Sequence, residues 1–170
     1  MNHQSNQMNK SICIILSIFG ILTNLNAQVA TDSEVYKTLK ANDSLIFERS
    51  FNKCEIQHLN QLIAEDFEFY HDIAGITSSK EKFIQTMNEG ICNPNNPSKP
   101  TRELVEGSLE VFLLKNNGQT YGALQNGIHK FFETTNGNKV EGSTAKFSHL
   151  WIIEDEKWIL KRVISFDHKM

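Results

Sequence analysis

The sequence predicts an α+β fold, in which a curved antiparallel sheet packs on N-terminal helices. Apolar residues between about 35 and 63 recur at helical spacing, whereas those after residue 101 alternate with polar residues. Pairs such as Asn136-Gly137 mark tight turns between the alternating stretches. Helices followed by an antiparallel meander are typical of α+β domains. A long, bent sheet with helices on its concave side would leave a hollow between the two layers.

Two helices are expected before the sheet. Thr31 or Asp32 can cap the first helix, which continues toward Phe51 with its apolar residues on one side. The second helix covers residues 56–63, where isoleucine and leucine again recur at helical spacing. Together these segments provide the apolar surface that a sheet needs on one face.

A short strand and a third helix follow. Phenylalanine and histidine alternate with polar or less apolar residues over Phe67–Asp72, which is the period of a strand. A turn over Asp72–Gly75 ends this strand. The sequence Ser78-Ser79-Lys80-Glu81 has the form of a capping box and predicts a helix over about 79–88.

The stretch Gly90–Thr101 contains all three prolines of the chain and predicts an irregular loop. Loops of this length often border a binding site. Beyond the loop, alternation and turn signals predict four strands, over Arg102–Lys115, Gln119–Phe132, Lys139–Glu154 and Lys157–Asp167.

The first 27 residues have the pattern of a secretory signal peptide. Lys10 precedes a mostly apolar run, Ser11–Leu25, and a small-residue cleavage context ends at Ala27. The alternative is an uncleaved membrane anchor, but a run of about 15 residues is shorter than the roughly 20 that a spanning helix needs. We therefore expect a single domain over residues 28–170 that is exported to the periplasm or secreted.

Charge and cysteine content restrict the partners of this domain. Removing residues 1–27 removes Lys10 and no acidic residue, so the formal net charge changes from -3 to -4. A weakly acidic domain without a basic cluster is a poor candidate for binding nucleic acid or an anionic membrane surface. Cys54 and Cys92 remain after cleavage. They could form a disulfide in an oxidising compartment, or Cys54 could simply be packed in a helix.

The closing hairpin, Phe147–His168, carries two polar side chains within an apolar pattern. The odd residues of its first strand, which include His149 and Trp151, form the more aromatic face. The even residues of its second strand, which include Arg162, form the matching face. A two-residue turn at Asp155-Glu156 sets a register in which His149 faces Arg162 across the two strands. We therefore expect both to line a polar part of the pocket, next to Trp151.

A buried arginine keeps its charge and needs an acceptor. The acceptors considered for Arg162 are Glu68, Asp72, Asp167 or the carboxylate of a bound substrate. A neighbouring guanidinium pushes His149 toward its neutral form, in which the ring can accept a proton or bind a metal. The alternative is that Arg162 extends to the rim of the sheet with only its stem buried, while His149 is hydrogen-bonded within the core.

Three more residues are expected at the polar end of the pocket. His71 continues the phenylalanine face of its strand, and Asp72 follows it at the turn. Arg102 opens the main part of the sheet after the proline-containing loop. A carboxylate at a turn often bonds only the local backbone, and this is the alternative for Asp72.

Two histidines have no clear assignment. The predicted turn at Asn136-Gly137 places His129 on the face away from His149, but a bulge would reverse this, so its side stays open. His168 lies at the end of the last strand, where a frayed terminus is the simpler interpretation. The strand histidines suggest a metal site, but none are spaced as ligands, and no metal is predicted. No phosphate loop, C-x-x-C or nucleophile-elbow motif predicts a cofactor or a hydrolase.

Three stretches of the chain resemble one known superfamily. They are FNKCEIQHLNQLIAEDFEFYHD from Phe51, GITSSKEKFI from Gly75, and the closing AKFSHLWIIEDEKWILKRVISFDH from Ala145. The chain is similar to the nuclear transport factor 2-like superfamily, in its SnoaL-like branch classed as domain of unknown function 4440. The most specific part is the closing hairpin, in which a tryptophan follows a charged turn and the strand ends in Ser-x-Asp-His. The resemblance covers nearly all of residues 28–170.

The resemblance implies a cone-shaped α+β fold with a pocket inside the cone and frequent dimerisation through the outer face of the sheet. On that outer face we expect Leu150, Ile152 and Val163. Relatives in the superfamily include ketosteroid isomerase, scytalone dehydratase, limonene epoxide hydrolase and polyketide cyclases, as well as binding and transport modules. Enzymes of this group use a pocket carboxylate or histidine as a base.

These observations predict an exported protein that binds an unknown small molecule, forms a homodimer and needs no cofactor. The ligand-pocket residues would be His71, Arg102, Trp151 and Arg162. One alternative is a cofactor-free isomerase, dehydratase or cyclase in which Asp72 or His149 is the general base and Arg162 stabilises negative charge. Another alternative is a non-catalytic dimeric interaction module.

Overall fold

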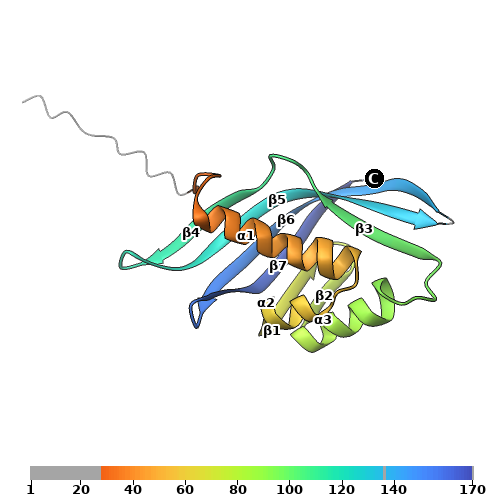
Figure 1. The fold of residues 1–170 in the computed structure, drawn as a ribbon, viewed down its shortest axis with the longest axis horizontal. Helices are drawn as coiled ribbons and strands as arrows, with labels where there is room; N and C mark the ends of the chain where they lie inside the picture. The colour runs from red at the N-terminus through yellow and green to blue at the C-terminus, as the bar shows by residue number, and fades with distance from the viewer. Residues whose placement is uncertain (1–27, 136, 170) are drawn as a thin grey trace, which may run out of the picture.

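The computed structural model describes residues 28–135 and 137–169, and the expected signal peptide over residues 1–27 lies outside them. A curved seven-stranded sheet wraps around one side of helix α1 (Glu34–Ser44) (Figure 1). The predicted α+β class with a curved sheet and N-terminal helices is confirmed. Within the described residues, every helix is too short or too polar to cross a membrane.

Helices cover the concave side of the sheet and one of its ends. Helix α1 continues directly into a π-helical segment, and helix α3 does the same. The helical elements after α1 are η1 (Leu45–Asn52), α2 (Gln57–Leu62), α3 (Lys80–Thr86) and η2 (Met87–Ile91). The strands are β1 (Ile63–His71), β2 (Gly75–Ser78), β3 (Ser98–Leu104), β4 (Glu110–Asn116), β5 (Gln119–Thr135), β6 (Asn138–Glu154) and β7 (Lys157–Lys169).

Serine side chains begin two of these helices. Ser33 caps α1, because its Oγ accepts the backbone N–H of Tyr36 at 3.2 Å. The predicted caps, Thr31 and Asp32, lie just outside the helix. Ser79 caps α3, and its Oγ accepts the N–H of Lys82 at 3.3 Å. The cap thus lies one residue after Ser78, the serine that the predicted capping box would pair with Glu81.

The sheet differs from a simple meander in two places. The strand expected over residues 102–115 is two strands, β3 and β4, which pair with different halves of β5. Gly107, with φ of 74°, lies in the break between them. At the other edge, the short strand β2 adds to β1, which runs parallel to β7. The strand order is therefore β2-β1-β7-β6-β5-β3, with β4 also on β5.

The closing hairpin follows the predicted register only near its turn. Trp151 pairs with Leu160 as expected, but Leu150 then pairs with Arg162 and His149 with Val163. Lys161 is thus an extra residue in β7, which is a β-bulge. The prediction that His149 faces Arg162 is wrong, because the bulge moves the side chains of residues 162–166 to the opposite face.

This bulge reverses the faces of the sheet on which Arg162 and Val163 were expected. Arg162 points outward, and its Nε lies 2.6 Å from Oε2 of Glu68, one of the acceptors considered for it. Val163 turns inward and is only 6% exposed, so its expected place on the outer face is wrong. Ile164 and Phe166 are the exposed apolar residues on this part of β7.

A second bulge decides the position of His129. The register of β5 and β6 shifts between Lys130 and Phe132, so that His129 pairs with Ala145 and not with Thr144. His129 is therefore buried, with 3% of its surface exposed. The bulge that the sequence left open brings His129 to the inner face, where His149 also lies.

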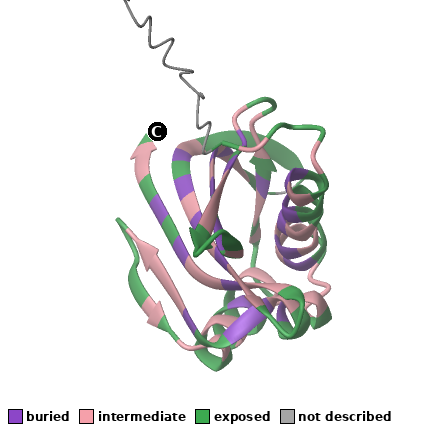
Figure 2. Cartoon of the chain, turned by 90° about the vertical axis from the view of Figure 1, so that its left-hand side faces the viewer, coloured by how far each residue is buried: buried purple, intermediate pink, exposed green. Residues whose placement is uncertain are grey.

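The core lies between the inward side of the helices and the concave face of the sheet. Figure 2 shows buried residues on the side of α1 that faces the sheet and at alternate positions along the strands. The largest fully buried side chains are Trp151, Phe67, Phe147, Leu39, Leu59 and Leu160. Alternation along β6 thus buries Trp151 and His149, as the hairpin pattern predicted.

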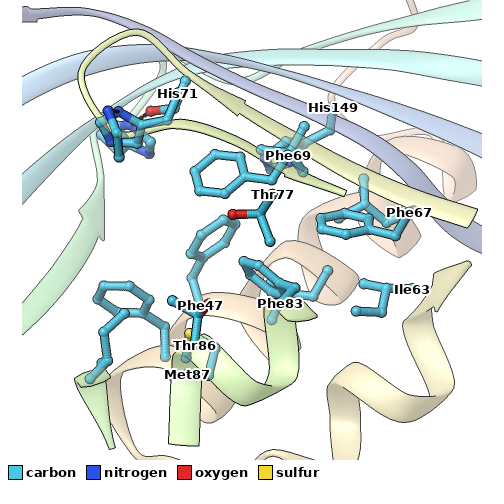
Figure 3. Close-up of a pocket in the computed structure, with 18 of the residues that line it drawn as sticks. Phe47, Ile63, Phe67, Phe69, His71, Thr77, Phe83, Thr86, Met87 and His149 are labelled. Atoms are coloured by element: carbon cyan, nitrogen blue, oxygen red, sulfur yellow. Dashed lines mark hydrogen bonds between the residues drawn. The ribbon is translucent and has the colours of Figure 1, made fainter. Parts of the chain in front are cut away.

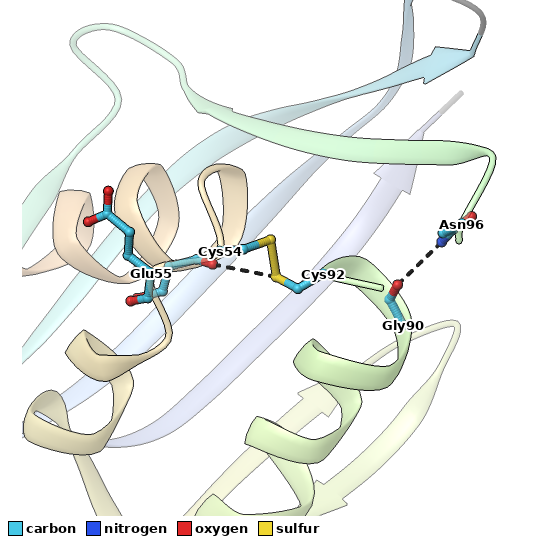
Figure 4. The surroundings of a disulfide bond; sticks show 6 residues. Cys54, Glu55, Gly90, Cys92 and Asn96 are labelled. Carbon is cyan, nitrogen blue, oxygen red and sulfur yellow. Dashed lines mark hydrogen bonds between the residues drawn. A yellow bond between two sulfur atoms is a disulfide. The ribbon is translucent and has the colours of Figure 1, made fainter. Parts of the chain in front are cut away.

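A disulfide joins two of the helical segments. Cys54 follows η1, Cys92 follows η2, and their Cα atoms lie 5.6 Å apart (Figure 4). The sequence left this pairing open. The bridge ties the end of the helix that covers the sheet to the end of the α3–η2 helix, which packs at one end of the cone.

Candidate functional site

A cavity of about 290 Å³ lies between the helices and the concave face of the sheet. Most of its lining is aromatic or aliphatic (Figure 3). The lining includes phenylalanines from η1, β1, α3 and β5, namely Phe47, Phe51, Phe67, Phe69, Phe83 and Phe131. Its polar side chains are His71, Thr77, Thr86, His129, His149 and Ser165.

Two of the predicted site residues, His71 and His149, line this cavity, and four do not. Trp151 is fully buried beside it, and Arg102 is buried in a neighbouring ion pair. Arg162 lies on the outer face, and the Asp72 side chain, 34% exposed, lies at the end of β1. The expected pocket residues are therefore divided between the cavity, its outer wall and the surface.

His149 is fully buried in the cavity wall, where its ring stacks on Phe47 with 5.7 Å between centroids. Its Nδ1 lies 3.1 Å from Oε1 of Gln125. The amide of Gln125 is fixed, because Oε1 accepts Trp151 Nε1–H at 2.8 Å while Nε2 donates to the carbonyl of Leu39. Since Oε1 only accepts, neutral His149 carries its proton on Nδ1. Its Nε2 then carries a lone pair and has no hydrogen-bond partner among the described residues.

A buried ion pair lies next to this histidine. Arg102 on β3 donates to both carboxylate oxygens of Asp43 on α1, at 2.7 and 3.2 Å, and both side chains are at most 3% exposed. The guanidinium also lies 3.9 Å from the centre of the Phe47 ring. Burial raises the pKa of Asp43, and the charge and hydrogen bonds of Arg102 oppose this rise. Each charge thus depends on the other to be tolerated inside the protein.

Asn52, the last residue of η1, holds the backbone of the same strand. Its Oδ1 accepts the N–H of Arg102 at 2.8 Å, and its Nδ2 donates to the carbonyl of Arg102 at 2.9 Å. The helix end and the strand are thereby fixed to each other beside the ion pair.

A chain of hydrogen bonds leads from the ion pair toward the end of β1. Nε of Arg102 lies 3.3 Å from Nδ1 of His129, whose Nε2 lies 3.3 Å from Oγ of Ser165. The same Oγ lies 3.4 Å from Nε2 of His168. Finally, Nδ1 of His168 lies 2.5 Å from Oδ1 of Asp72. Two members of this chain, His129 and Ser165, line the cavity.

His71 lies beside the end of this chain. Its Nδ1 accepts the backbone N–H groups of Ile73 and Ala74, both at 3.1 Å, and its ring stacks on His168 at 4.3 Å. His71, Asp72 and His168 together offer ligand atoms within 4.8 Å of one another. A cation bound there would have to replace the hydrogen bonds that these atoms make.

No protein-family model and no curated protein matches the sequence. Solved structures match it in fold. A nuclear transport factor 2 (NTF2-like) superfamily protein from Salmonella enterica is 15% identical, with a TM-score of 0.58 over 79% of this chain and 92% of its own. The chain has the nuclear transport factor 2-like fold.

Two further structures agree with this nuclear transport factor 2-like fold. Aln2 from a Streptomyces species is 8% identical, with a TM-score of 0.61 over 78% of this chain and 89% of its own. A Catenulispora acidiphila protein, solved in complex with S-DNPA, is 9% identical, with a TM-score of 0.59 over 77% and 92% of the two chains. The narrower assignment to domain of unknown function 4440 stays a prediction.

Several polar residues inside the nuclear transport factor 2-like cone were not predicted from the sequence. Asp43 could have been found, because it lies at helical spacing between Leu39 and Ile46 on an otherwise apolar stripe. His168 could not, since only the end of β7 as folded brings it next to Ser165 and Asp72.

The two inner histidines should make stability depend on pH. Burial, and then the charge of Arg102, lowers the pKa of His129 to about 3 and that of His149 well below its usual value. In the unfolded chain both histidines become protonated near pH 6.5. Stability is therefore complete above pH 6.5 and is lost as pH falls toward 3. Each histidine should contribute a slope of up to about 1.4 kcal/mol per pH unit.

Urea unfolding at pH 7, 6 and 5 measures this slope. Replacing His129→Gln should reduce it, because one of the two titrating groups is removed. Asp43 acts in the opposite sense but is present in both proteins. Equal slopes for the wild type and the variant would contradict a neutral, buried His129.

Proposed function

We propose that this protein is exported and binds a small, largely apolar molecule inside the cone. The observation that carries this proposal is the cavity itself, which is lined by phenylalanine rings and by His149, whose buried Nε2 has no hydrogen-bond partner among the described residues. Sites for small molecules are commonly apolar with a few directed polar groups. The apparent signal peptide, Met1–Ala27, supports export to the periplasm or out of the cell.

The tautomer of His149 restricts the ligand. Because Nε2 carries a lone pair and can only accept a hydrogen bond, the matching ligand group is a donor such as a hydroxyl or an N–H. A buried polar atom without a partner is costly, so a ligand donor that reaches Nε2 gains more there than in water. We therefore expect an aromatic or polycyclic molecule with one hydroxyl group, and we expect a carboxylate to be disfavoured.

The same lone pair supports a second candidate function, a cofactor-free isomerase, dehydratase or cyclase. An unprotonated imidazole in an apolar cavity can remove a proton from a bound substrate. His149 fits the role of general base better than Asp72, whose carboxylate does not line the cavity. Proton exchange at an acidic carbon of a bound ketone, followed by NMR, would separate catalysis from simple binding.

The fluorescent probe N-phenyl-1-naphthylamine tests whether the cavity is accessible. We expect it to bind the purified protein with micromolar affinity and to lose at least tenfold in affinity in Thr77→Trp, which fills the cavity. Ile76→Trp is the matched control, because Ile76 is the preceding residue on β2 and is 67% exposed. Equal binding by both variants, or no binding by the wild type, would contradict the proposal.

Native mass spectrometry of protein purified from its source tests for a retained ligand. The same spectrum reports the subunit count, and we propose a homodimer that forms through the outer face of the sheet. Exposed apolar residues support this face, among them Ile164 and Leu124, which are 45% and 38% exposed. A monomeric mass at micromolar concentration would count against the dimer without affecting the binding proposal.

A further inference from the structure

The last strand, β7, carries Ser165-Phe166-Asp167-His168 near its end, and the proposed binding function assigns no role to this motif. In a regular strand, residues three apart point to opposite faces. Here Asp167 has φ of 60°, and the pairing of β6 with β7 shifts between Thr144 and Lys146. This bulge turns His168 to the side of Ser165 and brings its Nε2 to 3.4 Å from the Ser165 Oγ. Backbone strain of this kind often marks functional positions.

Asp72 holds the other side of the His168 ring. Oδ1 of Asp72 lies 2.5 Å from Nδ1 of His168, and Oδ2 of Asp72 accepts the backbone N–H of His168 at 3.3 Å. The backbone N–H of Asp72 donates in turn to the carbonyl of Ser165 at 3.1 Å. The ring is also stacked on His71. Ser165, His168 and Asp72 are thus connected in the order hydroxyl, imidazole and carboxylate.

Arg102 and Asp72 set the directions of these hydrogen bonds from the two ends of the network, because a guanidinium only donates and a carboxylate only accepts. A guanidinium only donates, so Nδ1 of His129 must accept, and the neutral His129 ring carries its proton on Nε2. That proton is donated to Ser165 Oγ. The Ser165 hydroxyl then donates to Nε2 of His168, and Nδ1–H of His168 donates to Asp72. This is the direction that activates a serine: the hydroxyl proton already points at the base, and the carboxylate fixes the tautomer of that base.

We propose that Ser165 is a nucleophile for acyl transfer, with His168 as its general base and Asp72 as the residue that positions His168. Ser165 lines the cavity, so this inference rests on the proposed binding function and adds a substrate class, small esters with an apolar acyl group. The arrangement is defined by geometry and not by a sequence motif for hydrolases, and such triads recur on unrelated folds.

The reaction balances without a cofactor. Ser165 Oγ bonds to the ester carbonyl carbon while its proton moves to Nε2 of His168. The bond to the alcohol oxygen then breaks, that oxygen takes the proton from His168, and the acyl group stays on Ser165. Water attacks the acyl carbonyl, gives one proton to His168, and the serine oxygen leaves with that proton. One ester and one water thereby give one carboxylic acid and one alcohol.

His129 has a defined place in this reaction. Its Nε2–H donates to Ser165 Oγ before the attack. When Oγ bonds to the carbonyl carbon, the negative charge develops on the former carbonyl oxygen, two bonds from Oγ. A substrate that turns this oxygen toward His129 would bring it within reach of the same N–H, and a neutral donor in a dry site stabilises such a charge. Burial and the charge of Arg102 keep the pKa of His129 at about 3, so the ring stays a neutral donor at physiological pH.

A fluorophosphonate probe and p-nitrophenyl butyrate test the proposal with the purified protein. The probe should modify one residue, Ser165, as mapped by peptide mass spectrometry. Turnover of the ester should fall about 10²-fold to 10⁴-fold in Ser165→Ala. Ser148→Ala is the matched control, because Ser148 lies on the neighbouring strand with its hydroxyl on Asn126, and it should keep full labelling and turnover. Labelling at another residue, or equal turnover in Ser165→Ala, would overturn the proposal.

Asp72→Asn separates positioning from structure. This variant should lower kcat about 10²-fold or more while KM stays within twofold, since Asp72 does not contact the substrate. A change in KM alone would overturn its assigned role. EDTA should not alter the turnover. Loss of turnover in EDTA would overturn the serine mechanism in favour of a metal held by His71 and His168.

Binding of N-phenyl-1-naphthylamine is the readout that distinguishes this inference from the proposed function. If the naphthylamine binds but Ser165 is not labelled, acyl transfer is overturned and the binding proposal stands. If Ser165 is labelled but the naphthylamine does not bind, the apolar cavity proposal fails while the nucleophile is supported. The far-UV circular dichroism spectrum of Ser165→Ala should match that of the wild type, which shows that the variant is folded.

Discussion

Replacing Arg102→Met should destabilise the protein by about 3–5 kcal/mol, because it leaves the carboxylate of Asp43 buried without its partner. The loss should be similar for Asp43→Leu, which leaves the guanidinium unpaired beside Phe47. The double variant should be more stable than either single variant, since removing both charges also removes the cost of burying them. Urea unfolding at pH 7 of the four proteins completes a double-mutant cycle.

A neighbouring surface pair provides the control for this cycle. Lys139 forms an ion pair with Glu103, which is also on β3. Both of these side chains are about half exposed, at 46% and 53%. Lys139→Met should therefore change stability by less than about 1 kcal/mol. Additive losses in the Arg102 and Asp43 double variant would show that the two side chains do not interact as the structure describes.

The second large effect is expected from the disulfide. Cys54 and Cys92 are 38 residues apart, and closing a loop of this length restricts the unfolded chain by about 4 kcal/mol in the chain-entropy estimate. Because such estimates often exceed measured values, we expect Cys54→Ala with Cys92→Ala to lose about 2–4 kcal/mol. The loss should appear as a lower urea midpoint of unfolding.

Reduction separates the disulfide from the packing of the two side chains. Dithiothreitol should lower the midpoint of the wild type and leave the double-alanine variant unchanged. Binding of N-phenyl-1-naphthylamine should weaken in the same samples, because the bridge joins segments that line the cavity through Phe51 and Ile91. Free thiols at both Cys54 and Cys92 in the non-reduced wild type would contradict the bridge.

The architecture could be predicted from the sequence because it depends on local signals. Helical spacing, a serine cap before α3 and the turn at Asp155-Glu156 each involve neighbouring residues, and each appears in the structure. The bulges could not be predicted, because Lys161 and Asp167 carry no sequence signal that distinguishes them from other strand residues. One extra residue in a strand reverses all later side chains, so a single bulge moved Arg162 out of the site.

The site was predicted in part for the same reason. The extra residue, Lys161, lies in β7, so it leaves the alternation of β6 unchanged. The inward position of His149 on β6 therefore follows from alternation alone. Ser165 and His168 lie beyond Lys161, and their convergence needs both the first bulge and the positive φ of Asp167. Arg102 was expected at the site, but its partner Asp43 comes from α1, and no local pattern connects residues so far apart in the chain.

The hydrogen bonds between Asn52 and the backbone of Arg102 also bear on how copies of this protein can associate. Strand β3 is an edge of the sheet, and an unprotected edge invites another chain to add a strand. Here the side chain of Asn52 occupies the outward N–H and carbonyl of Arg102. Two residues earlier, on the same side of the strand, Pro100 has no N–H to offer. The middle of this edge strand is therefore protected against strand exchange and fibril-like pairing.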